Sequence, residues 1–293
     1  MKKICVFVGN RANYSSIKSV MKAIKSHPQL ELQLVLGASA PLERFGKVEN
    51  LIKSDGYTPD YIFHNIVEGE NPATMAKSTG VGLMDASMVF DNLKPDMLVV
   101  VGDRYEMMSV TLAAAYMNIL IVHTMGGEVT GTIDESIRHA ITKFAQIHFP
   151  ANEDSRKRII KMGEDERFVF NVGCPRTDLV AEELEHDSYD ELTGLFKNFG
   201  GVGQVFNLRE DFLLVSQHSV TTEFGSNRIQ IEETLKALNE LKMPTIMLWP
   251  NPDAGSDDIS KGIRTFRENH NPQWLHLFKN LPINIYIHLM NIT

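Results

Sequence analysis

The first half of this chain alternates short apolar segments with longer amphipathic ones, and this alternation constrains the fold more than any other feature. Four segments are apolar on both faces, as is typical of parallel strands covered by helices: Ile4–Val8, Leu30–Leu36, Met97–Val101 and Leu120–His123. Three segments between them have helical spacing: Tyr14–Ser26, Ala73–Leu93 and Tyr105–Met117. Strands that alternate with helices predict an α/β fold with a doubly wound parallel sheet.

A further helix is predicted over Asp134–His148. Its apolar residues recur every four positions and form one stripe: Ile133, Ile137, Ile141 and Ala145. Thr132 and Asp134 are both suited to cap its first turn, because their side-chain oxygens accept hydrogen bonds from unpaired amides.

A second α/β unit is predicted after the glycine-rich segment Phe199–Gly203. Phe212–Ser216 and Thr245–Leu248 are expected to be strands, with a helix over Ile229–Leu241 between them. The length of 293 residues suggests roughly two domains of ~150 residues each. We expect an N-terminal domain over residues 1–175, a connecting region over 176–205 and a C-terminal domain over 206–293.

The C-terminal domain is expected to be incomplete. Its last strong signal, Ile283–Ile292, is apolar and ends without a polar tail. About three strands fit in this unit, whereas a doubly wound sheet usually has about five or six. The sequence therefore predicts a chain truncated within its second domain.

Composition excludes several classes of function. The net charge is −8, without a long basic run, which argues against a nucleic-acid partner. The N-terminal apolar run, Ile4 to Gly9, is too short for a signal peptide, and no segment is long and apolar enough to span a membrane. Two cysteines, Cys5 and Cys174, form no disulfide scaffold, so we expect a cytoplasmic protein.

Polar motifs follow the first and third long strands. Gly9–Tyr14 forms a strand-to-helix turn that would present amides to an anion, and Arg11 adds a guanidinium suited to phosphate. Asp103 follows Met97–Val101 at the edge where ligands of open α/β sheets bind, so it is a candidate acid or base. The alternatives are an ordinary turn with a surface arginine and, for Asp103, a helix N-cap.

A third motif extends from His123 to His139. Its glycines permit close approach of a ligand near Glu128. Asp134 and Arg138 are four residues apart on one helix face and are expected to pair. The alternatives are a plain turn and a solvated salt bridge worth under ~1 kcal/mol. Its place at the same sheet edge as the other motifs favours a functional role.

Two more motifs follow the strands of the second unit. His218 lies after Phe212–Ser216, and Asn251 and Asp253 lie in the turn after Thr245–Leu248. A polar turn of this kind is suited to sugar hydroxyls or a base, although turn chemistry alone also explains it. The ten histidines include no H-E-x-x-H motif, so no metal site is predicted.

Together these motifs resemble the hydrolysing UDP-N-acetylglucosamine 2-epimerases of sialic acid biosynthesis. The resemblance covers essentially the whole chain, and Gly126–Lys143 is its most specific part. The other matching segments are Asn10–Ser15, Lys94–Asp96, Gly102–Arg104, Gly173–Pro175, Gln217–Thr222 and Pro250–Ser256. The resemblance implies a GT-B arrangement of two Rossmann-like domains, with the nucleotide sugar in the cleft between them.

The family's reaction implies roles for residues of this chain. A base removes the C2 proton of the sugar, UDP leaves from C1, and water adds to the glucal to give N-acetylmannosamine and UDP. By resemblance, Asp103 and Asp134 are catalytic carboxylates, Arg138 supports Asp134, and His218 lies near the phosphates. The residues expected to contact the UDP-sugar are Arg11, Ala12, Arg104, His218, Asn251 and Asp253. No cofactor or metal is implied, and we expect a homodimer or homotetramer.

The chain departs from the family pattern in three places. Met125 stands where the family has a catalytic glutamate, and Glu128 is the nearest candidate to replace it as a catalytic residue. Asn13 stands where the family has a carboxylate. The segment that binds the UDP ribose and phosphates, and the closing helix of the family, are absent from this sequence.

Three alternatives to UDP-N-acetylglucosamine epimerisation follow. The same motifs suit a UDP-N,N′-diacetylbacillosamine 2-epimerase of the legionaminic acid route. Met125 and the missing C-terminal segment favour a catalytically impaired protein that binds nucleotide sugars, whereas Asp103, Asp134 and His218 oppose it. A GT-B glycosyltransferase is disfavoured by the Gly131–His139 motif.

Overall fold

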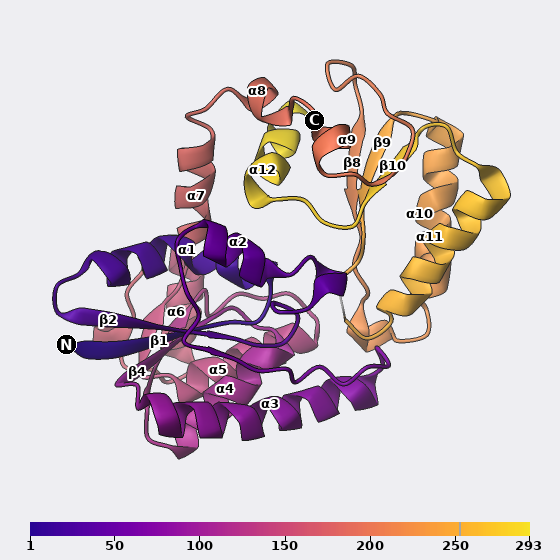
Figure 1. The fold of residues 1–293 in the computed structure, drawn as a ribbon. Helices are drawn as coiled ribbons and strands as arrows, with labels where there is room; N and C mark the ends of the chain where they lie inside the picture. The colour runs from indigo at the N-terminus through magenta and orange to yellow at the C-terminus, as the bar shows by residue number, and fades with distance from the viewer. Residues whose placement is uncertain (252) are drawn as a thin grey trace. The chain divides into compact units, whose positions relative to one another are not determined.

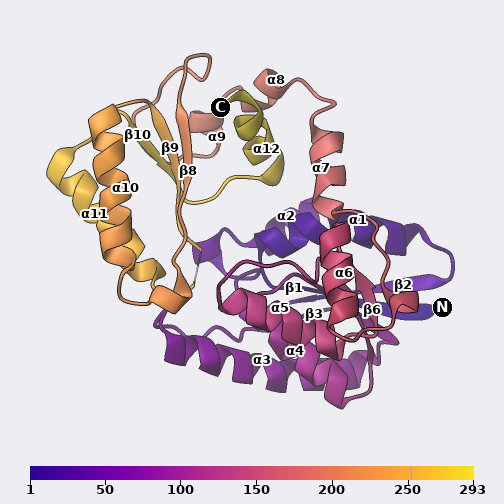
Figure 2. The same ribbon diagram turned by 180° about the vertical axis from the view of Figure 1, so that it is seen from behind.

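The computed structural model describes residues 1–251 and 253–293, which form two compact units (Figures 1 and 2). Unit 1 comprises Met1–Gly69 and Ala73–Leu179. Unit 2 comprises Val180–Thr293 together with the short segment Glu70–Pro72, which lies between the two parts of unit 1 in sequence. Each unit has its own sheet and its own apolar core.

Unit 1 is built on a six-stranded sheet in the order β3-β2-β1-β4-β5-β6, with every neighbouring pair parallel. Its strands are β1 (Lys2–Val8), β2 (Leu30–Leu36), β3 (Tyr61–Ile62), β4 (Met97–Val101), β5 (Leu120–Thr124) and β6 (Ile147–Phe149). The chain adds strands on one side of β1 and then returns to add β4 on the other. This reversal is a topological switch point, the place where open α/β sheets bind ligands.

Helices cover both faces of this sheet, as the doubly apolar strands require (Figure 1). One face packs against α1 (Arg11–Ser26) and α2 (Val48–Ser54), and the other packs against α3 (Pro72–Leu93), α4 (Tyr105–Tyr116) and α5 (Ile133–Phe144). Phe7 and Phe90 are buried on the second face, Ile17 and Met21 on the first. Burying each such side chain contributes about 1.5–3 kcal/mol to stability.

The remaining helical elements follow β2 and β6. They are the 3₁₀ turns Glu43–Phe45 and Glu166–Phe168, helix α6 (Glu153–Lys161) and helix α7 (Pro175–Glu183), along which the division between the units falls.

The predicted helix over Asp134–His148 is wrong at its C-terminal end. Helix α5 stops at Phe144, and Ile147–Phe149 form strand β6 beside β5. The apolar stripe continues through Ala145, which hid the boundary, but β-branched and aromatic residues follow it and fit a strand. In contrast, β2 and β4 have the predicted bounds.

Unit 2 has a four-stranded sheet in the order β7-β10-β9-β8. Its strands are β7 (Val202–Gly203), β8 (Leu213–Ser216), β9 (Thr245–Leu248) and β10 (Leu275–Phe278), with β7 antiparallel to β10. Figure 2 shows α10 (Asn227–Leu241) and α11 (Ser256–His270) on one side of the sheet, where they share an apolar cluster with it. The short helices α8 (Ser188–Leu192) and α9 (Leu195–Asn198) and helix α12 (Ile283–Ile292) contribute to a second cluster.

Several elements of unit 2 were not predicted from the sequence. Helix α11 and strands β7 and β10 were not assigned, and the sheet has four strands where about three were expected. The apolar segment Ile283–Ile292 is a helix, which buries Ile285 and Leu289 against the sheet. Among the described residues, no helix is both long enough and apolar enough to cross a membrane.

Candidate active site

Asp103 lies at the carboxyl end of β4, two residues before helix α4 begins. The preceding Gly102 has a φ of 76°, a conformation that glycine adopts without steric cost. Arg104 occupies the N-cap position and makes no side-chain cap bond, so the N-cap alternative for Asp103 is wrong. The Asp103 carboxylate instead forms an ion pair with Arg138 of helix α5.

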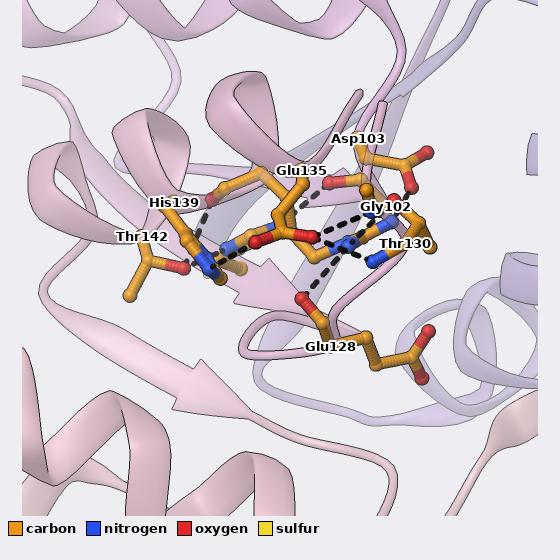
Figure 3. Close-up of polar contacts among 10 residues, drawn as sticks. Gly102, Asp103, Glu128, Thr130, Glu135, His139 and Thr142 are labelled. Carbon is orange, nitrogen blue, oxygen red and sulfur yellow. Dashed lines mark hydrogen bonds and ion pairs between the residues drawn. The ribbon is translucent and has the colours of Figure 1, made fainter. Parts of the chain in front are cut away.

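Arg138 is buried, with a side chain only 2% exposed, whereas the Asp103 side chain is 28% exposed. Its Nη1 donates to the Glu128 carbonyl oxygen at 2.8 Å and to Thr130 Oγ1 at 3.5 Å, and its Nη2 donates to Asp103 Oδ2. One guanidinium therefore joins the end of β4 to the loop that follows β5 (Figure 3). The sequence analysis did not predict this pairing, because nothing in the local spacing links residues so far apart.

Asp134 lies in the first turn of α5 and is half-buried. It precedes Arg138 by one helical turn, which keeps both residues on one helix face. The support of Asp134 by Arg138 stays a prediction. The described contacts of the guanidinium include those with Asp103 and with the Glu128–Thr130 loop.

Glu135 is a site residue that the sequence analysis missed. Its Oε2 accepts hydrogen bonds from the backbone amides of Thr130 and Gly131, each at 2.7 Å. These bonds lower the pKa of Glu135, because they favour the charged carboxylate. The sequence Thr132-x-x-Glu135 has the form of a capping box and was the available signal. The Glu135 carboxylate bonds amides that precede the N-cap Thr132, and it thereby fixes the conformation of the loop that contains Glu128.

His123 of strand β5 is fully buried beside this network. Its Nε2 lies 2.8 Å from the Gly102 carbonyl oxygen, and its Nδ1 lies 3.1 Å from Thr142 Oγ1. A carbonyl only accepts, so Nε2 carries the proton, and the unprotonated Nδ1 shares the single Thr142 hydroxyl proton with the Arg138 carbonyl oxygen. Burial lowers the pKa of His123 to about 4, which keeps the imidazole neutral near pH 7.

The loop after β5 is tightly packed. Met125 has a φ of 60°, and its amide donates to the Phe149 carbonyl at 2.9 Å. A Cβ on Gly126 would lie 2.8 Å from His123 Nδ1, and one on Gly127 would lie 2.5 Å from the Ser155 carbonyl oxygen. Both glycines therefore serve close packing against β5 and α6, which is a stronger requirement than the plain turn considered as an alternative.

Glu128 contributes its backbone rather than its carboxylate to this network. Figure 3 shows its carbonyl directed into the network and its carboxylate pointing away from it. The side chain is half-buried. Its proposed replacement of the family's glutamate is therefore a matter for experiment.

The switch point between β1 and β4 carries a second polar group. Asn10 caps helix α1 by accepting from the Asn13 amide, and its Nδ2 donates to Glu106 Oε1 at 2.7 Å. Arg104 Nε donates to the same oxygen at 2.9 Å. Glu106 is 2% exposed, and it is a second residue that the sequence analysis did not single out.

The remaining predicted ligand contacts of unit 1 lie at the start of α1. Arg11 is the first residue of the helix, and burial lowers its pKa to about 10. Ala12 is exposed. The amides of this first turn, apart from that bonded to Asn10, favour an anion at the helix N-terminus.

The predicted site residues of unit 2 gather after β8 and β9. His218 is exposed; its Nδ1 accepts from the Asn251 amide at 3.2 Å, and its Nε2 lies 3.2 Å from Ser216 Oγ. Asn251 is exposed and Asp253 is half-buried. Pro252, part of the same motif, lies outside the described residues. The structure thus joins His218 and Asn251 in one hydrogen-bonded turn.

Within the described ranges, no three histidine, cysteine or acidic side chains are grouped closely enough to hold a metal ion. Both cysteines are free. The polar groups at the strand ends are carboxylates, guanidiniums and amides, a set suited to anion binding and proton transfer.

The strand order of unit 1, together with a second α/β unit, defines a GT-B-like fold. Within this fold class, the chain belongs to the UDP-N-acetylglucosamine 2-epimerase family, whose sequence model matches residues 22–293.

Curated relatives agree with this assignment. A UDP-N,N′-diacetylbacillosamine 2-epimerase (hydrolyzing) from Legionella pneumophila is 29% identical over 96% of this chain and 74% of the relative. A UDP-N-acetylglucosamine 2-epimerase from Neisseria meningitidis is also 29% identical, over 92% of this chain and 68% of the relative.

Solved structures show the same fold. The UDP-GlcNAc 2-epimerase of Neisseria meningitidis, bound to UDP-GlcNAc, superposes with a TM-score of 0.80 at 18% identity, covering 100% of this chain and 76% of that one. The Methanocaldococcus jannaschii UDP-GlcNAc 2-epimerase, in complex with UDP-GlcNAc and UDP, gives a TM-score of 0.76 at 17% identity over 97% of this chain and 75% of that one.

Proposed function

We propose that this protein is a hydrolysing nucleotide-sugar 2-epimerase that converts UDP-N-acetylglucosamine and water to N-acetylmannosamine and UDP. The observation that carries the proposal is the Asp103–Arg138 ion pair at the carboxyl edge of the unit 1 sheet, in a chain of the 2-epimerase family. A carboxylate held by a buried guanidinium has a fixed orientation, which proton transfer to or from carbon requires.

The reaction has two stages, and each balances in protons. In the first, a carboxylate takes the C2 proton, the C1–O bond breaks, and its electron pair leaves with UDP as C1 and C2 become doubly bonded. In the second, water adds its hydroxyl to C1 and passes its remaining proton to a carboxylate, while a carboxylic acid delivers a proton to the opposite face of C2. We assign these proton transfers to Asp103 and Asp134, with Arg138 orienting Asp103.

Substrate binding is assigned to cationic and amide groups near the strand ends. Arg11 and Arg104 supply guanidiniums in unit 1, and Ala12 supplies a first-turn amide of α1. In unit 2, His218 takes the diphosphate, while Asn251 and Asp253 bind hydroxyl groups. Arg104 is already oriented by Glu106, so little conformational entropy is lost when it binds an anion.

Because Met125 stands at the position of the family's catalytic glutamate, a third proton-transfer group would have to come from another residue. A thioether carries no transferable proton, so the glutamate that the family resemblance places here has no equivalent at this position. Glu128 is the candidate replacement, provided that its side chain turns towards the substrate, because its backbone already lies in the Arg138 network.

A second substrate is favoured by the relatives. Two relatives at 29% identity are named as N,N′-diacetylbacillosamine 2-epimerases, from Legionella pneumophila and Campylobacter jejuni. UDP-N,N′-diacetylbacillosamine is therefore the alternative substrate of the same site.

The test is a proton NMR time course of the purified chain with each UDP-sugar in turn. Release of UDP together with the free 2-epimerised sugar from one of them supports the proposal and identifies the substrate. Tight binding of both UDP-sugars without turnover of either would contradict the proposal. It would indicate a protein that binds nucleotide sugars without epimerising them, the outcome that Met125 favours.

A further inference from the structure

His123, Thr142, Arg138 and Asp103 are linked by a series of polar contacts. His123 Nε2 donates to the Gly102 carbonyl at 2.8 Å, and Thr142 Oγ1 lies 3.1 Å from His123 Nδ1. Thr142 Oγ1 also donates to the Arg138 carbonyl oxygen at 3.0 Å, one turn earlier on α5, so its one proton is shared between that carbonyl and His123 Nδ1. Arg138 closes the circuit by pairing with Asp103, the residue that follows Gly102.

Both sides of Gly102 are held by strand β5. Its amide donates to the Thr124 carbonyl at 3.1 Å, and its carbonyl accepts from His123. Gly102 is in the left-handed region, where its own conformational preferences restrain it little. The direction in which the chain enters Asp103 is therefore set by contacts with β5, one from the Thr124 backbone and one from the His123 imidazole.

The imidazole itself has no room to move. His123 is fully buried, and Gly126 lies so close that a Cβ there would be 2.8 Å from Nδ1 and 3.0 Å from Thr142 Oγ1. Its position is thus determined by β5, by the loop after β5 and by α5 together. Its two ring nitrogens contact the carboxyl end of β4 and α5, the two elements that carry the ion pair.

We propose that His123 is a positioning residue for the reaction: its neutral imidazole fixes the Gly102 carbonyl, and thereby holds the Asp103 carboxylate in register with Arg138. The inference rests on the proposed function only for its effect on turnover. The tautomer and the hydrogen-bonded circuit are properties of the folded chain and are testable without substrate.

Two substitutions separate the two bonds of the imidazole. In His123→Gln the side-chain amide nitrogen occupies about the place of Nε2, so the donor to Gly102 is kept and the acceptor for Thr142 is lost. In His123→Asn the amide oxygen occupies about the place of Nδ1, so the reverse holds. We expect His123→Gln to keep kcat within about 5-fold of wild type and His123→Asn to lower it about 100-fold, with KM changed little in both.

The matched control is His148→Asn on the neighbouring strand β6. His148 is 1% exposed and faces Glu164 at 3.4 Å, so its substitution disturbs a buried imidazole that has no contact with Gly102. We expect this variant to lose thermal stability while its folded fraction keeps the wild-type kcat. A fall in kcat that follows melting temperature alike in all three variants would overturn the positioning role.

A readout without substrate is ¹⁵N NMR of the imidazole ring. The proposal predicts a neutral His123 with its proton on Nε2 and slow exchange of that proton with solvent. A proton on Nδ1, or rapid exchange, would overturn the proposal even if the enzyme is active. If no UDP-sugar is turned over but the predicted tautomer is found, the proposed function fails while the circuit stands.

Discussion

Asp103 and Arg138 are separated by 35 residues in sequence and form an ion pair at the carboxyl edge of the unit 1 sheet. The pair connects the end of β4 to helix α5 and, through the Glu128 carbonyl, to the loop after β5. Asp103 belongs to the second polar motif of the sequence and Arg138 to the third, so this ion pair brings two motifs that are separate in sequence into contact.

Removing the guanidinium should harm both stability and turnover. Arg138→Met leaves the Asp103 carboxylate and the Glu128 carbonyl without their shared donor, and we expect a loss of about 3 kcal/mol in the free energy of unfolding together with loss of turnover. Urea denaturation and steady-state kinetics measure the two effects. Arg167→Met is the control, because its partner Asp165 is exposed and the arginine is 81% exposed. We expect that variant to lose under ~1 kcal/mol. Equal losses in both variants would contradict the account.

Much of unit 1 follows from its sequence because its strands are apolar on both faces and its helices carry a clear stripe. Strand β4 and the start of α4 at Tyr105 were predicted at the observed bounds. The pairing of Arg138 was not predictable, because it depends on how α5 lies beside the end of β4. Local spacing favoured Asp134 as the partner, and only the tertiary structure brings Asp103 to the guanidinium.

The less regular parts were harder to predict for a physical reason. Helix α11 has many charged residues, so its apolar stripe of Ile259 and Ile263 is short. Glu106 was missed because a carboxylate within an apolar helix is usually a surface residue. The arrangement of the two domains around a cleft and the oligomeric state stay predictions.

Glu128→Gln tests whether this residue has taken over the role of the missing glutamate. We expect the variant to lose turnover without losing stability, because only the side-chain carboxylate changes and the carbonyl that binds Arg138 remains. The double variant Met125→Glu with Glu128→Gln should then recover turnover, since it moves the carboxylate to the position that the family uses. Kinetics of the single and double variants measure both effects. Wild-type activity in Glu128→Gln would exclude the replacement.

Gly127 should be the most sensitive glycine of the loop after β5. In Gly127→Ala the new methyl group meets the Ser155 carbonyl at 2.5 Å, in addition to the strain of a φ of 81°. We expect a loss of about 3 kcal/mol, measured by denaturant unfolding. Gly56→Ala is the matched control: its φ is also 81°, but nothing lies within 4 Å, so we expect only about 1 kcal/mol. Similar losses in both would show that packing against α6 is loose.

The free energy of unfolding should fall in mild acid, because the unfolded chain binds a proton at His123 more readily than the folded chain does. Burial lowers the pKa of His123 to about 4, and the nearby Arg138, His139 and His148 act in the same direction. Between pH 6.5 and 4 the unfolded chain therefore binds a proton that the folded chain does not. The contribution is complete above about pH 6.5, and about 3 kcal/mol is lost as the pH falls to about 4. Unfolding free energies of wild type and His123→Gln across this range isolate the effect, and parallel curves would contradict it.

The most direct test of the central claim is deuterium incorporation at C2 of the sugar by wild type and Asp103→Asn in deuterated water. The account predicts that wild type releases UDP and N-acetylmannosamine carrying deuterium at C2. It predicts that Asp103→Asn gives neither product while it retains its fold and binds UDP. Undiminished C2 deuteration by Asp103→Asn would contradict the account, because the carboxylate held by Arg138 would then take no part in the reaction.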